Sequence, residues 1–360
     1  MSRLAAVSPA LPPHVYDQAE ISAVIGPLLT EDPGRRTVLD RLHRASGVST
    51  RHLVLPLEKY AGLTSFDQAN DLFIALGADL AEHAVRQALA DADILAEEVD
   101  FLLFTSVTGV SAPSIDSLLV ERLGLRRDVR RLPSFGWGCA GGSAGVARVH
   151  DYLTGHPQDV AVLLSVELCS LTVQQGDDSL ANLVSSGLFG DGAAAVVMVG
   201  EERAVSGRTA GPRVLGSRSV IYPDSAGSLG WDIGGSGFRI VLSAGMPEVI
   251  EEHLRQDVVT LLAEHDLTLG DVTTWVAHTG GPRILEAAAR ALGVADEAFA
   301  RSWSSLDRVG NLSSSSVLHV LADTLDGGDL EPGDVGVMFA FGPGVGAEIV
   351  LLHQPQEGPG

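Results

Sequence analysis

Cys139 is the residue of this sequence best placed to act as a nucleophile. It lies in the glycine-rich stretch 133–145, and a segment with the apolar spacing of a helix follows directly. We therefore expect a tight turn that sets the thiol at a helix N-terminus, where backbone N–H groups and the helix dipole favour the thiolate. The flanking glycines would let a bulky substrate approach the sulfur. The alternative is a small buried cysteine that fills a gap in the core.

A thiolate nucleophile needs a base or an ion-pair partner, and two further residues fit such a site. His278 ends the apolar segment 273–277 and precedes Thr-Gly-Gly-Pro, so we expect it at the end of a strand, facing a cleft. Asn311 precedes a run of serines at an expected helix start. A hydrogen-bonded strand-end histidine and a helix N-cap are the structural alternatives. Together with Cys139, the two residues supply the parts of an acyl-transfer site that stabilises an oxyanion.

The glycines at positions 136, 138 and 141 also match the G-x-G-x-x-G pattern of dinucleotide-binding loops. That pattern should follow a long apolar strand, whereas residues 130–134, R-R-L-P-S, make a poor strand interior. Asp159 stands roughly where an acidic partner of the ribose would, but no clear second strand ends there. A nucleotide-dependent dehydrogenase is therefore the weaker alternative.

The composition excludes several classes of protein. The chain has 360 residues, of which 45% are hydrophobic, so it is long and apolar enough to bury a large core. Its net charge of −22 argues against nucleic-acid partners, because phosphate contacts need clustered Lys and Arg. Its two cysteines cannot build a disulfide framework. The sequence shows neither a signal peptide nor an apolar run of membrane-spanning length, so we expect a cytoplasmic protein without a membrane partner.

Helix-like and strand-like segments alternate along the chain, which predicts an α/β fold. We expect helices at residues 72–92, 115–123, 142–153, 247–264 and 284–292, and strands at 99–104, 160–166, 193–199, 273–277, 335–341 and 347–352. The polar, glycine-rich stretch 201–212 is the expected linker.

A short internal repeat indicates two similar halves. Residues 189–195 and 341–347 both read F-G-x-G-x-x-A, and both run into an apolar strand. Chance is the alternative, since Gly and Ala are common here, but duplication explains the pattern better. We place the N-terminal half at residues 1–205, the C-terminal half at 206–352 and a flexible tail at 353–360.

These motifs together resemble the type III polyketide synthases, which belong to the chalcone synthase superfamily and have a thiolase-like fold. The resemblance covers about residues 51–352 and rests on five segments: G-C-A-G-G at 138–142, L-F-G-D-G at 188–192, H-T-G-G-P at 278–282, G-N-L-S-S at 310–314 and A-F-G-P-G at 340–344. In the last segment alanine replaces the first glycine of the family pattern. The resemblance implies a five-layer αβαβα architecture built from two similar halves.

The resemblance also implies an acyltransferase that condenses malonyl-CoA repeatedly by decarboxylative Claisen chemistry. Cys139 would carry the growing chain as a thioester. His278 would hold the thiolate in an ion pair and then, with Asn311, would donate a hydrogen bond to the thioester carbonyl of malonyl-CoA. Phe189 and Phe238 would be gatekeepers between a coenzyme A tunnel and the cavity. The implied enzyme is a cytoplasmic homodimer that needs no metal and no cofactor besides its coenzyme A thioester substrates.

Further substrate-binding residues are expected around these motifs. Gly280, Gly281 and Ser313 lie in the segments that carry the resemblance. Because coenzyme A carries phosphates, the acidic chain needs a locally basic tunnel mouth. Arg44 and Arg51 lie where the family places such residues, with Arg283 as a further candidate. Cys169, the second cysteine, is expected to be buried packing.

Within the family, the sequence is most similar to bacterial tetrahydroxynaphthalene synthases, through residues 165–171, 179–184, 222–224 and 229–231. By this resemblance Tyr222 would help to admit malonyl-CoA as the starter. Phe104 and Trp137 stand where smaller residues are usual, and both would alter the cavity volume. The expected product is an aromatic polyketide such as 1,3,6,8-tetrahydroxynaphthalene. The alternatives are an alkylpyrone or alkylresorcinol synthase primed by another acyl-CoA, and a non-catalytic member of the family.

Overall fold

The computed structural model of the chain describes residues 1–206 and 211–356. Nine strands form one long mixed sheet in the order β11-β12-β13-β8-β1-β7-β6-β4-β5. Five of them come from the first half of the chain: β1 (Ser2–Ala10), β4 (Val99–Thr105), β5 (Arg130–Ser134), β6 (Val160–Leu168) and β7 (Asp191–Gly200). The other four come from the second half: β8 (Arg213–Ile221), β11 (Val272–Ala277), β12 (Val335–Gly342) and β13 (Gly346–His353).

The strand pattern of the first half is repeated in the second. β4 and β6 are parallel, while β7 is antiparallel to both β6 and β1. In the same way β11 and β12 are parallel, while β13 is antiparallel to both β12 and β8. The expectation of two similar halves is therefore confirmed. β1 and β8 pair through Ser2 and Val214, so the two halves share a continuous sheet.

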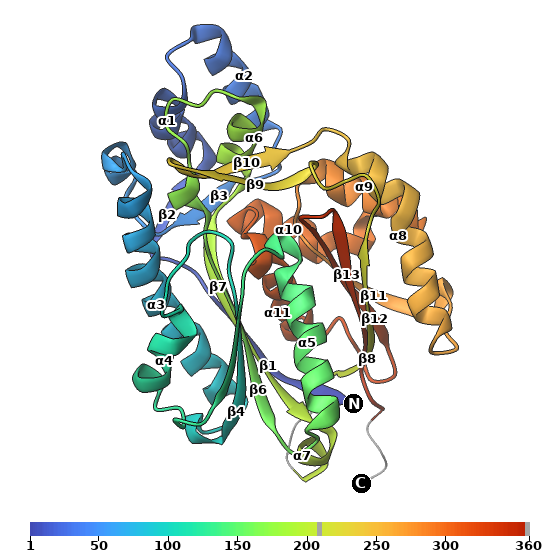
Figure 1. Cartoon of the computed structure of the whole chain (residues 1–360). Coiled ribbons are helices and arrows are strands. Elements are labelled where there is room, and N and C mark those ends of the chain that lie inside the picture. The colour runs from blue at the N-terminus through green and yellow to red at the C-terminus, as the bar shows by residue number, and fades with distance from the viewer. Residues whose placement is uncertain (207–210, 357–360) are drawn as a thin grey trace.

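The strands of the first half and those of the second half form two layers of the sheet. Helices lie between these two layers and on the outer face of each (Figure 1). The inner layer consists of α5 (Gly141–Gly155) and α11 (Ser316–Asp326), which pack in a central apolar cluster. On one outer face lie α3 (Phe66–Asp91) and α4 (Ile115–Leu123), and on the other lie α8 (Met246–Ala263), α9 (Pro282–Leu292) and α10 (Ala300–Val309). This arrangement confirms the αβαβα layers.

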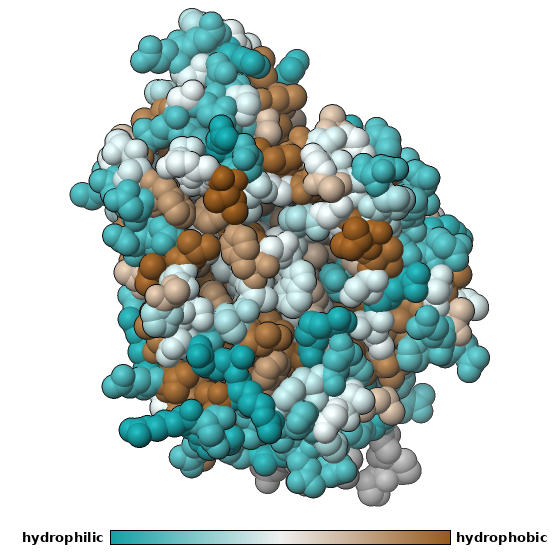
Figure 2. Space-filling model, viewed as in Figure 1, coloured by the Kyte–Doolittle hydropathy of each residue, from teal (hydrophilic) through white to brown (hydrophobic). Residues whose placement is uncertain are grey.

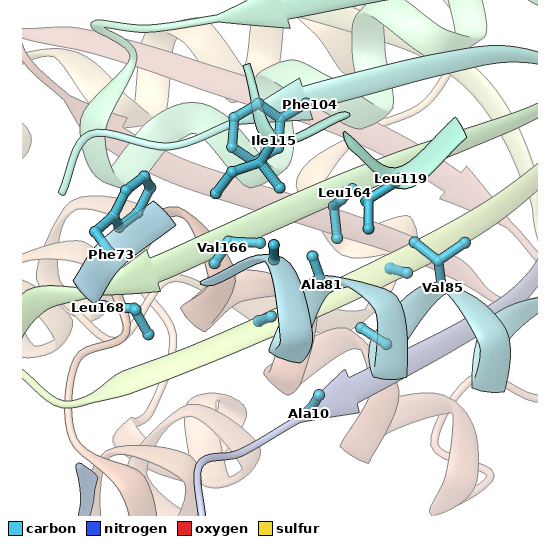
Figure 3. Close-up of a cluster of buried hydrophobic side chains, with 14 of the residues drawn as sticks. Ala10, Phe73, Ala81, Val85, Phe104, Ile115, Leu119, Leu164, Val166 and Leu168 are labelled. Atoms are coloured by element: carbon cyan, nitrogen blue, oxygen red, sulfur yellow. The ribbon is translucent and has the colours of Figure 1, made fainter. Parts of the chain in front are cut away.

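Each outer layer buries its own apolar cluster against the sheet. Figure 3 shows one of them, where Phe73 and Ala81 on α3 and Ile115 on α4 face Leu164 and Val166 on β6. Small residues on α3 bring the helix close to the sheet, which explains how a chain with only 5% aromatic residues packs a large core.

Several further elements lie toward one end of the molecule, in the upper part of Figure 1. They are β2 (His14–Asp17), α1 (Gln18–Leu29), α2 (Pro33–Arg44), β3 (Thr50–Leu53), α6 (Leu180–Leu188), β9 (Leu229–Gly234) and β10 (Gly237–Leu242). Figure 2 shows a mostly hydrophilic surface with separate hydrophobic patches, as the net charge of −22 leads one to expect.

Three expectations about the elements were wrong or incomplete. Residues 130–134 form β5 at the edge of the sheet, where exposed arginines and a proline are tolerated. The stretch expected to be a linker begins with the short helix α7 (Glu201–Ser206), and residues 207–210 lie outside the described part. The expected tail begins inside β13, whose last residue is His353, and residues 357–360 are not described.

Candidate active site

The turn that carries Cys139 lies where β5 gives way to α5. A single 3-10 turn, η3 (Gly138–Ala140), leads into the helix that begins at Gly141, which confirms the expected position of the thiol at a helix N-terminus. Gly138 has a φ of 53°, and a Cβ there would lie 2.4 Å from Pro343 Cδ. Only glycine allows this close approach of the two turns.

Cys139 meets the turn that carries Asn311 from the other half of the chain. Its Sγ lies 3.8 Å from the hydroxyl of Ser313. Asn311 Oδ1 accepts hydrogen bonds from the Ser313 N–H at 2.8 Å and from the Ser316 hydroxyl at 3.2 Å. Because its oxygen accepts these two bonds, the Asn311 amide has only its Nδ2 group left as a donor. A hydrogen bond from Asn311 lowers the pKa of the Cys139 thiol.

Asn311 also forms a backbone crossing with the segment around Phe189. The Asn311 N–H donates to the Leu188 carbonyl, and the Gly190 N–H donates to the Asn311 carbonyl, both at 2.9 Å. Phe189 and Asn311 therefore lie opposite each other as an isolated β-bridge. The crossing fixes Phe189 of one half against Asn311 of the other.

His278 reaches the same crossing from the end of β11. Its backbone N–H donates to the Phe339 carbonyl at 3.0 Å, and the Gly280 N–H donates to the His278 carbonyl at 2.9 Å. Thr279 Oγ1 donates to the carbonyl of Gly310, the residue before Asn311, at 3.5 Å. His278 Nδ1 is buried and has no hydrogen-bond partner among the described residues. His278 itself does not line the pocket at Cys139 described below.

Burial controls the charge of both groups. Desolvation raises the pKa of the Cys139 thiol to about 12, although hydrogen bonds from Ser313 and Asn311 oppose the rise. Desolvation also lowers the pKa of His278 to about 3. The expected preference for the thiolate at the helix N-terminus is therefore opposed by desolvation of the sulfur. A thiolate here needs a cation beside it.

A largely apolar pocket surrounds the thiol. It is lined by Val107, Gly138, Cys139, Cys169, Phe189, Leu229, Gly230, Trp231, Ile240, Ser313 and Pro343. Phe189 and Pro343 come from the two F-G-x-G-x-x-A segments, so the repeated turns line the pocket together. A second pocket shares Cys169, Phe189, Trp231 and Ile240 with the first. An apolar lining of this kind suits a reactive carbanion or thioester.

Comparisons with known proteins agree over the whole fold. The family model for the N-terminal domain of chalcone and stilbene synthases matches residues 1–202, and the model for the C-terminal domain matches residues 214–355. The chain belongs to the chalcone and stilbene synthase family of type III polyketide synthases. It is therefore an acyltransferase, and the alternative of a nucleotide-dependent dehydrogenase is wrong.

Individual relatives narrow the comparison. A 1,3,6,8-tetrahydroxynaphthalene synthase of Streptomyces peucetius is 52% identical over 351 residues, which cover 97% of this chain and 92% of that protein. The crystal structure of the enzyme of that name from Streptomyces coelicolor superposes with a TM-score of 0.92 at 31% identity, covering 99% of this chain and all of that one. An alpha-pyrone synthesis polyketide synthase-like protein of Mycobacterium tuberculosis is 30% identical, covering 95% of this chain and 88% of that protein.

Several residues expected at the site of this type III polyketide synthase lie elsewhere. Phe104 packs with Ile115 and Leu119 in the apolar cluster between the sheet and α4 (Figure 3). Tyr222 donates from its hydroxyl to Asp257 at 3.0 Å and stacks on His253, so it faces α8. Neither residue lines the pockets described above. Their expected effects on the cavity were argued from position in the sequence, which does not give the direction of a side chain.

The other expected residues are placed more closely. Trp137 caps the turn before Cys139 and packs on the central cluster without lining the pocket. Phe238 on β10 packs edge-to-face on Phe66, with the two ring centroids 5.4 Å apart. It lines a separate cavity of about 400 Å³. Gly281, with a φ of 112°, begins α9 beside Leu188.

The three arginines differ sharply in exposure. Arg44 is exposed at the end of α2, where its Nε donates to the Asp40 carbonyl. Arg283 is exposed near the start of α9. Arg51 is only 2% exposed, and its guanidinium is occupied by protein atoms. The expectation that Arg51 meets coenzyme A phosphates at a tunnel mouth is therefore wrong.

Part of the pocket lining was not expected from the sequence. Ile240 lies two residues after Phe238 on β10, so strand alternation from the expected gatekeeper was a signal for it. Val107 and Pro343 follow elements that the analysis did predict. Cys169 is buried as expected, yet it also lines the pocket beside Cys139.

The described part of the chain offers neither a metal site nor a membrane span. In residues 1–206 and 211–356, no three His, Cys, Asp or Glu side chains form a group that could hold a metal ion. No helix of this described part is both long and apolar enough to span a membrane.

Proposed function

We propose that this enzyme condenses malonyl-CoA units on Cys139 and cyclises the chain to 1,3,6,8-tetrahydroxynaphthalene. The observation that carries the proposal is the position of the Cys139 thiol, at a helix N-terminus and against Ser313, in an apolar pocket that both halves build. The specific product is supported by the 52% identity to a relative that bears this product's name.

In the first step the Cys139 thiolate attacks the thioester carbonyl of the starter. A new C–S bond forms to Cys139, and coenzyme A leaves with the proton that the thiol gave up. Since burial raises the pKa of the thiol, a neighbouring imidazolium must stabilise the thiolate, and we assign this role to His278. The described residues offer His278 Nδ1 no hydrogen-bond partner, which leaves the ring without a competing acceptor there.

In the second step malonyl-CoA loses CO₂, and the electron pair of the broken C–C bond forms an enolate. His278 and the Asn311 amide donate hydrogen bonds to the enolate oxygen. Because Asn311 Oδ1 already accepts from the Ser313 N–H and the Ser316 hydroxyl, its Nδ2 is preorganised as that donor. The enolate carbon then attacks the Cys139 thioester, the new C–C bond forms, and the thiolate is released for reloading.

We assign binding roles to residues around this centre. Phe189 separates the pocket at Cys139 from the one beside it, since it lines both, and Phe238 lines the neighbouring larger cavity. Gly280 and Gly281 keep the loop after His278 narrow enough for the thioester. Arg44 and Arg283 are the exposed candidates for the coenzyme A phosphates. As in the initial expectation, we propose a cytoplasmic homodimer that uses coenzyme A thioesters without a metal or another cofactor.

A second candidate function is an alkylpyrone or alkylresorcinol synthase primed by a longer acyl-CoA. The cavity of about 400 Å³ favours it, because Leu63, Phe66 and Val173 give part of that wall an apolar character. The mycobacterial relative with alpha-pyrone synthesis in its name is the corresponding comparison. Adding acyl-CoA starters of increasing length distinguishes the two, since a longer-chain preference would replace the malonyl-primed product.

The proposal is tested by trapping the acyl-enzyme with labelled malonyl-CoA. We expect wild-type protein to release labelled CO₂ and to carry a thioester on the peptide that contains Cys139. Cys139→Ala should lose the adduct, whereas Cys169→Ala should keep it, because Cys169 begins only a four-residue 3-10 turn and not an α-helix. Acyl transfer that survives Cys139→Ala would show that another residue is the nucleophile, and a protein that never loads would be a non-catalytic member.

A further inference from the structure

Arg51 is a buried cation in contact with the crossing of Phe189 and Asn311. Its Nη1 donates to the Phe189 carbonyl at 2.7 Å, while Nε and Nη2 both donate to Gln18 Oε1 at 3.1 and 2.8 Å. Every nitrogen of the guanidinium therefore has a protein acceptor. A surface arginine that awaits a phosphate would not be bound in this way.

Gln18 holds a second carbonyl of the same segment, that of Gly187. Its Nε2 donates to the Gly187 carbonyl at 2.6 Å, while its Oε1 takes the fork from Arg51. The carbonyls of Gly187 and Phe189 are thus held from one side, by Gln18 and Arg51. The Leu188 carbonyl and the Gly190 N–H are held from the other side, by Asn311. Four consecutive residues are fixed between a side-chain pair and the loop that carries a proposed catalytic amide.

The stem of Arg51 also contacts the other chain of the crossing. A Cβ on Gly310 would lie 3.2 Å from Arg51 Cγ and Cδ, so the arginine packs directly on the residue before Asn311. Gly310 has a φ of 75°, which a side chain there would strain. Arg51 therefore touches both strands of the bridge that aligns Phe189 with Asn311.

A buried guanidinium is costly unless its charge is balanced. Desolvation lowers the pKa of Arg51 to about 10, and the attraction of Asp191 opposes this fall. Asp191 in turn accepts hydrogen bonds from the backbone N–H groups of Val54 and Ser170, both at 2.7 Å. The positive charge of Arg51 is therefore balanced inside the protein by Asp191, at the start of β7. The elements α1, α2 and α6 lie at the same end of the molecule (Figure 1).

We infer that Arg51 is a positioning residue for decarboxylation, acting through the Phe189 carbonyl and the Gly310–Asn311 loop and not through contact with coenzyme A. The inference rests on the proposed function, because it assumes that Asn311 donates to the enolate. Without the guanidinium, the buried Phe189 carbonyl loses its donor and the crossing is free to shift. If the Asn311 amide is displaced by even a small distance, the catalytic rate falls, while the binding of substrate need not weaken.

The test compares Arg51→Met and Arg51→Lys with the exposed control Arg127→Met. We would measure kcat and KM for CO₂ release from malonyl-CoA, the Kd of coenzyme A, and the rate at which iodoacetamide alkylates Cys139. For Arg51→Met we expect kcat to fall about tenfold or more, with KM, Kd and the alkylation rate within about twofold of wild type. The kcat of Arg51→Lys should lie between those of wild type and Arg51→Met. A lysine ammonium can reach the Phe189 carbonyl but cannot donate two parallel hydrogen bonds to Gln18.

Each other outcome decides against the inference or against the function beneath it. An unchanged kcat in Arg51→Met overturns the inference, and so does a loss of coenzyme A affinity with kcat preserved, which would make Arg51 a ligand-binding arginine. If Arg51→Met does not fold, an Arg51→Lys enzyme with the kcat of Arg127→Met overturns it equally. Wild-type protein that releases no CO₂ defeats the proposed function itself, whatever the variants do.

Discussion

At the scale of single residues, the chemistry depends on which of the buried groups at Cys139 and His278 can be charged. Burial disfavours a thiolate at Cys139 and an imidazolium at His278 when each is considered alone, with pKa values of about 12 and about 3. A charge pair relieves both penalties, since each ion then replaces the lost water for the other. The nucleophile is therefore expected to depend on its partner far more than an exposed cysteine would.

Replacing His278 should expose this dependence. In a Cys169→Ala background, which removes the second thiol, His278→Gln should slow alkylation of Cys139 by iodoacetamide at pH 7 about tenfold or more. The apparent pKa of the reaction should rise, because the uncharged amide cannot balance a thiolate. The pH dependence of the alkylation rate measures both effects. An unchanged profile would mean that the helix N-terminus is sufficient by itself.

Asn311 should matter at a later step than Cys139. In Asn311→Ala the thiol can still be acylated, but one donor to the enolate oxygen is lost, so CO₂ release should fall about 100-fold or more. Trapped acyl-enzyme should accumulate in this variant when a non-decarboxylating acyl-CoA is supplied. Loss of acylation and decarboxylation to the same extent would instead assign Asn311 a structural role.

The sequence predicted these residues to different degrees, for a physical reason. Cys139, His278 and Asn311 stand at turns whose local glycines and serines announce them. Arg51 was misread because its acceptors, Gln18 and the Phe189 carbonyl, are 33 and 138 residues away. Local sequence does not show that an arginine is buried by distant segments. The direction of Phe104 and Tyr222 was equally a matter of tertiary packing.

At the scale of elements, the site depends on how closely α5 meets the turn after Asn311. A Cβ at Gly142 would lie 2.4 Å from the Ser314 carbonyl and 2.6 Å from Val317 Cγ1. At the other end of the same helix, a Cβ at Gly155 would meet nothing within 4 Å. The pair offers a matched comparison of two glycines in one helix.

Gly142→Ala should therefore destabilise the protein and damage the site. We expect the free energy of unfolding to fall by about 1–3 kcal/mol, because the overpacked helix must move away from the Ser313 turn. CO₂ release should fall as well, since Cys139 and Asn311 separate. Gly155→Ala should be neutral or more stable by up to about 1 kcal/mol. Urea unfolding of both variants checks this, and equal stabilities would refute the close-packing argument.

The elements were predictable only in part: β4, β6, β7, β11, β12 and β13 were expected from the sequence, whereas β1, β2, β3, β5, β8, β9 and β10 were not. Apolar periodicity located α4 at its observed bounds and β6 to within two residues of its end. β1 was missed because its sequence, S-R-L-A-A-V-S-P-A, carries a weak pattern. It is a strand because β7 and β8 flank it in the middle of the sheet. Pairing between distant strands, not local propensity, decided this element and the edge strand β5.

At the scale of the whole molecule, buried histidines link folding to pH. The pKa of His319 is lowered to about 4 by burial, while its ring shares a hydrogen bond with the Ala193 carbonyl. Since the folded pKa lies below the unfolded one, the unfolded chain binds the proton first as the pH falls. The contribution of His319 is complete near neutral pH and is lost between about pH 6.5 and the folded pKa.

His319→Gln should remove that part of the pH dependence. Glutamine can still donate to the Ala193 carbonyl but does not titrate. From pH 6.5 down to pH 4.5, the free energy of unfolding of wild type should fall by about 1 kcal/mol per pH unit more than that of the variant. Urea unfolding at a series of pH values measures the difference. Parallel curves for the two proteins would show that His319 is protonated in the fold.

The central claim is that both starter and extender are malonyl-CoA. The direct measurement is the mass of the product that forms when purified protein is incubated with labelled malonyl-CoA and no other acyl-CoA. The account predicts a product with the mass of 1,3,6,8-tetrahydroxynaphthalene, formed by wild type and absent from Cys139→Ala. An aromatic or pyrone product that appears only after a longer acyl-CoA is added would contradict it.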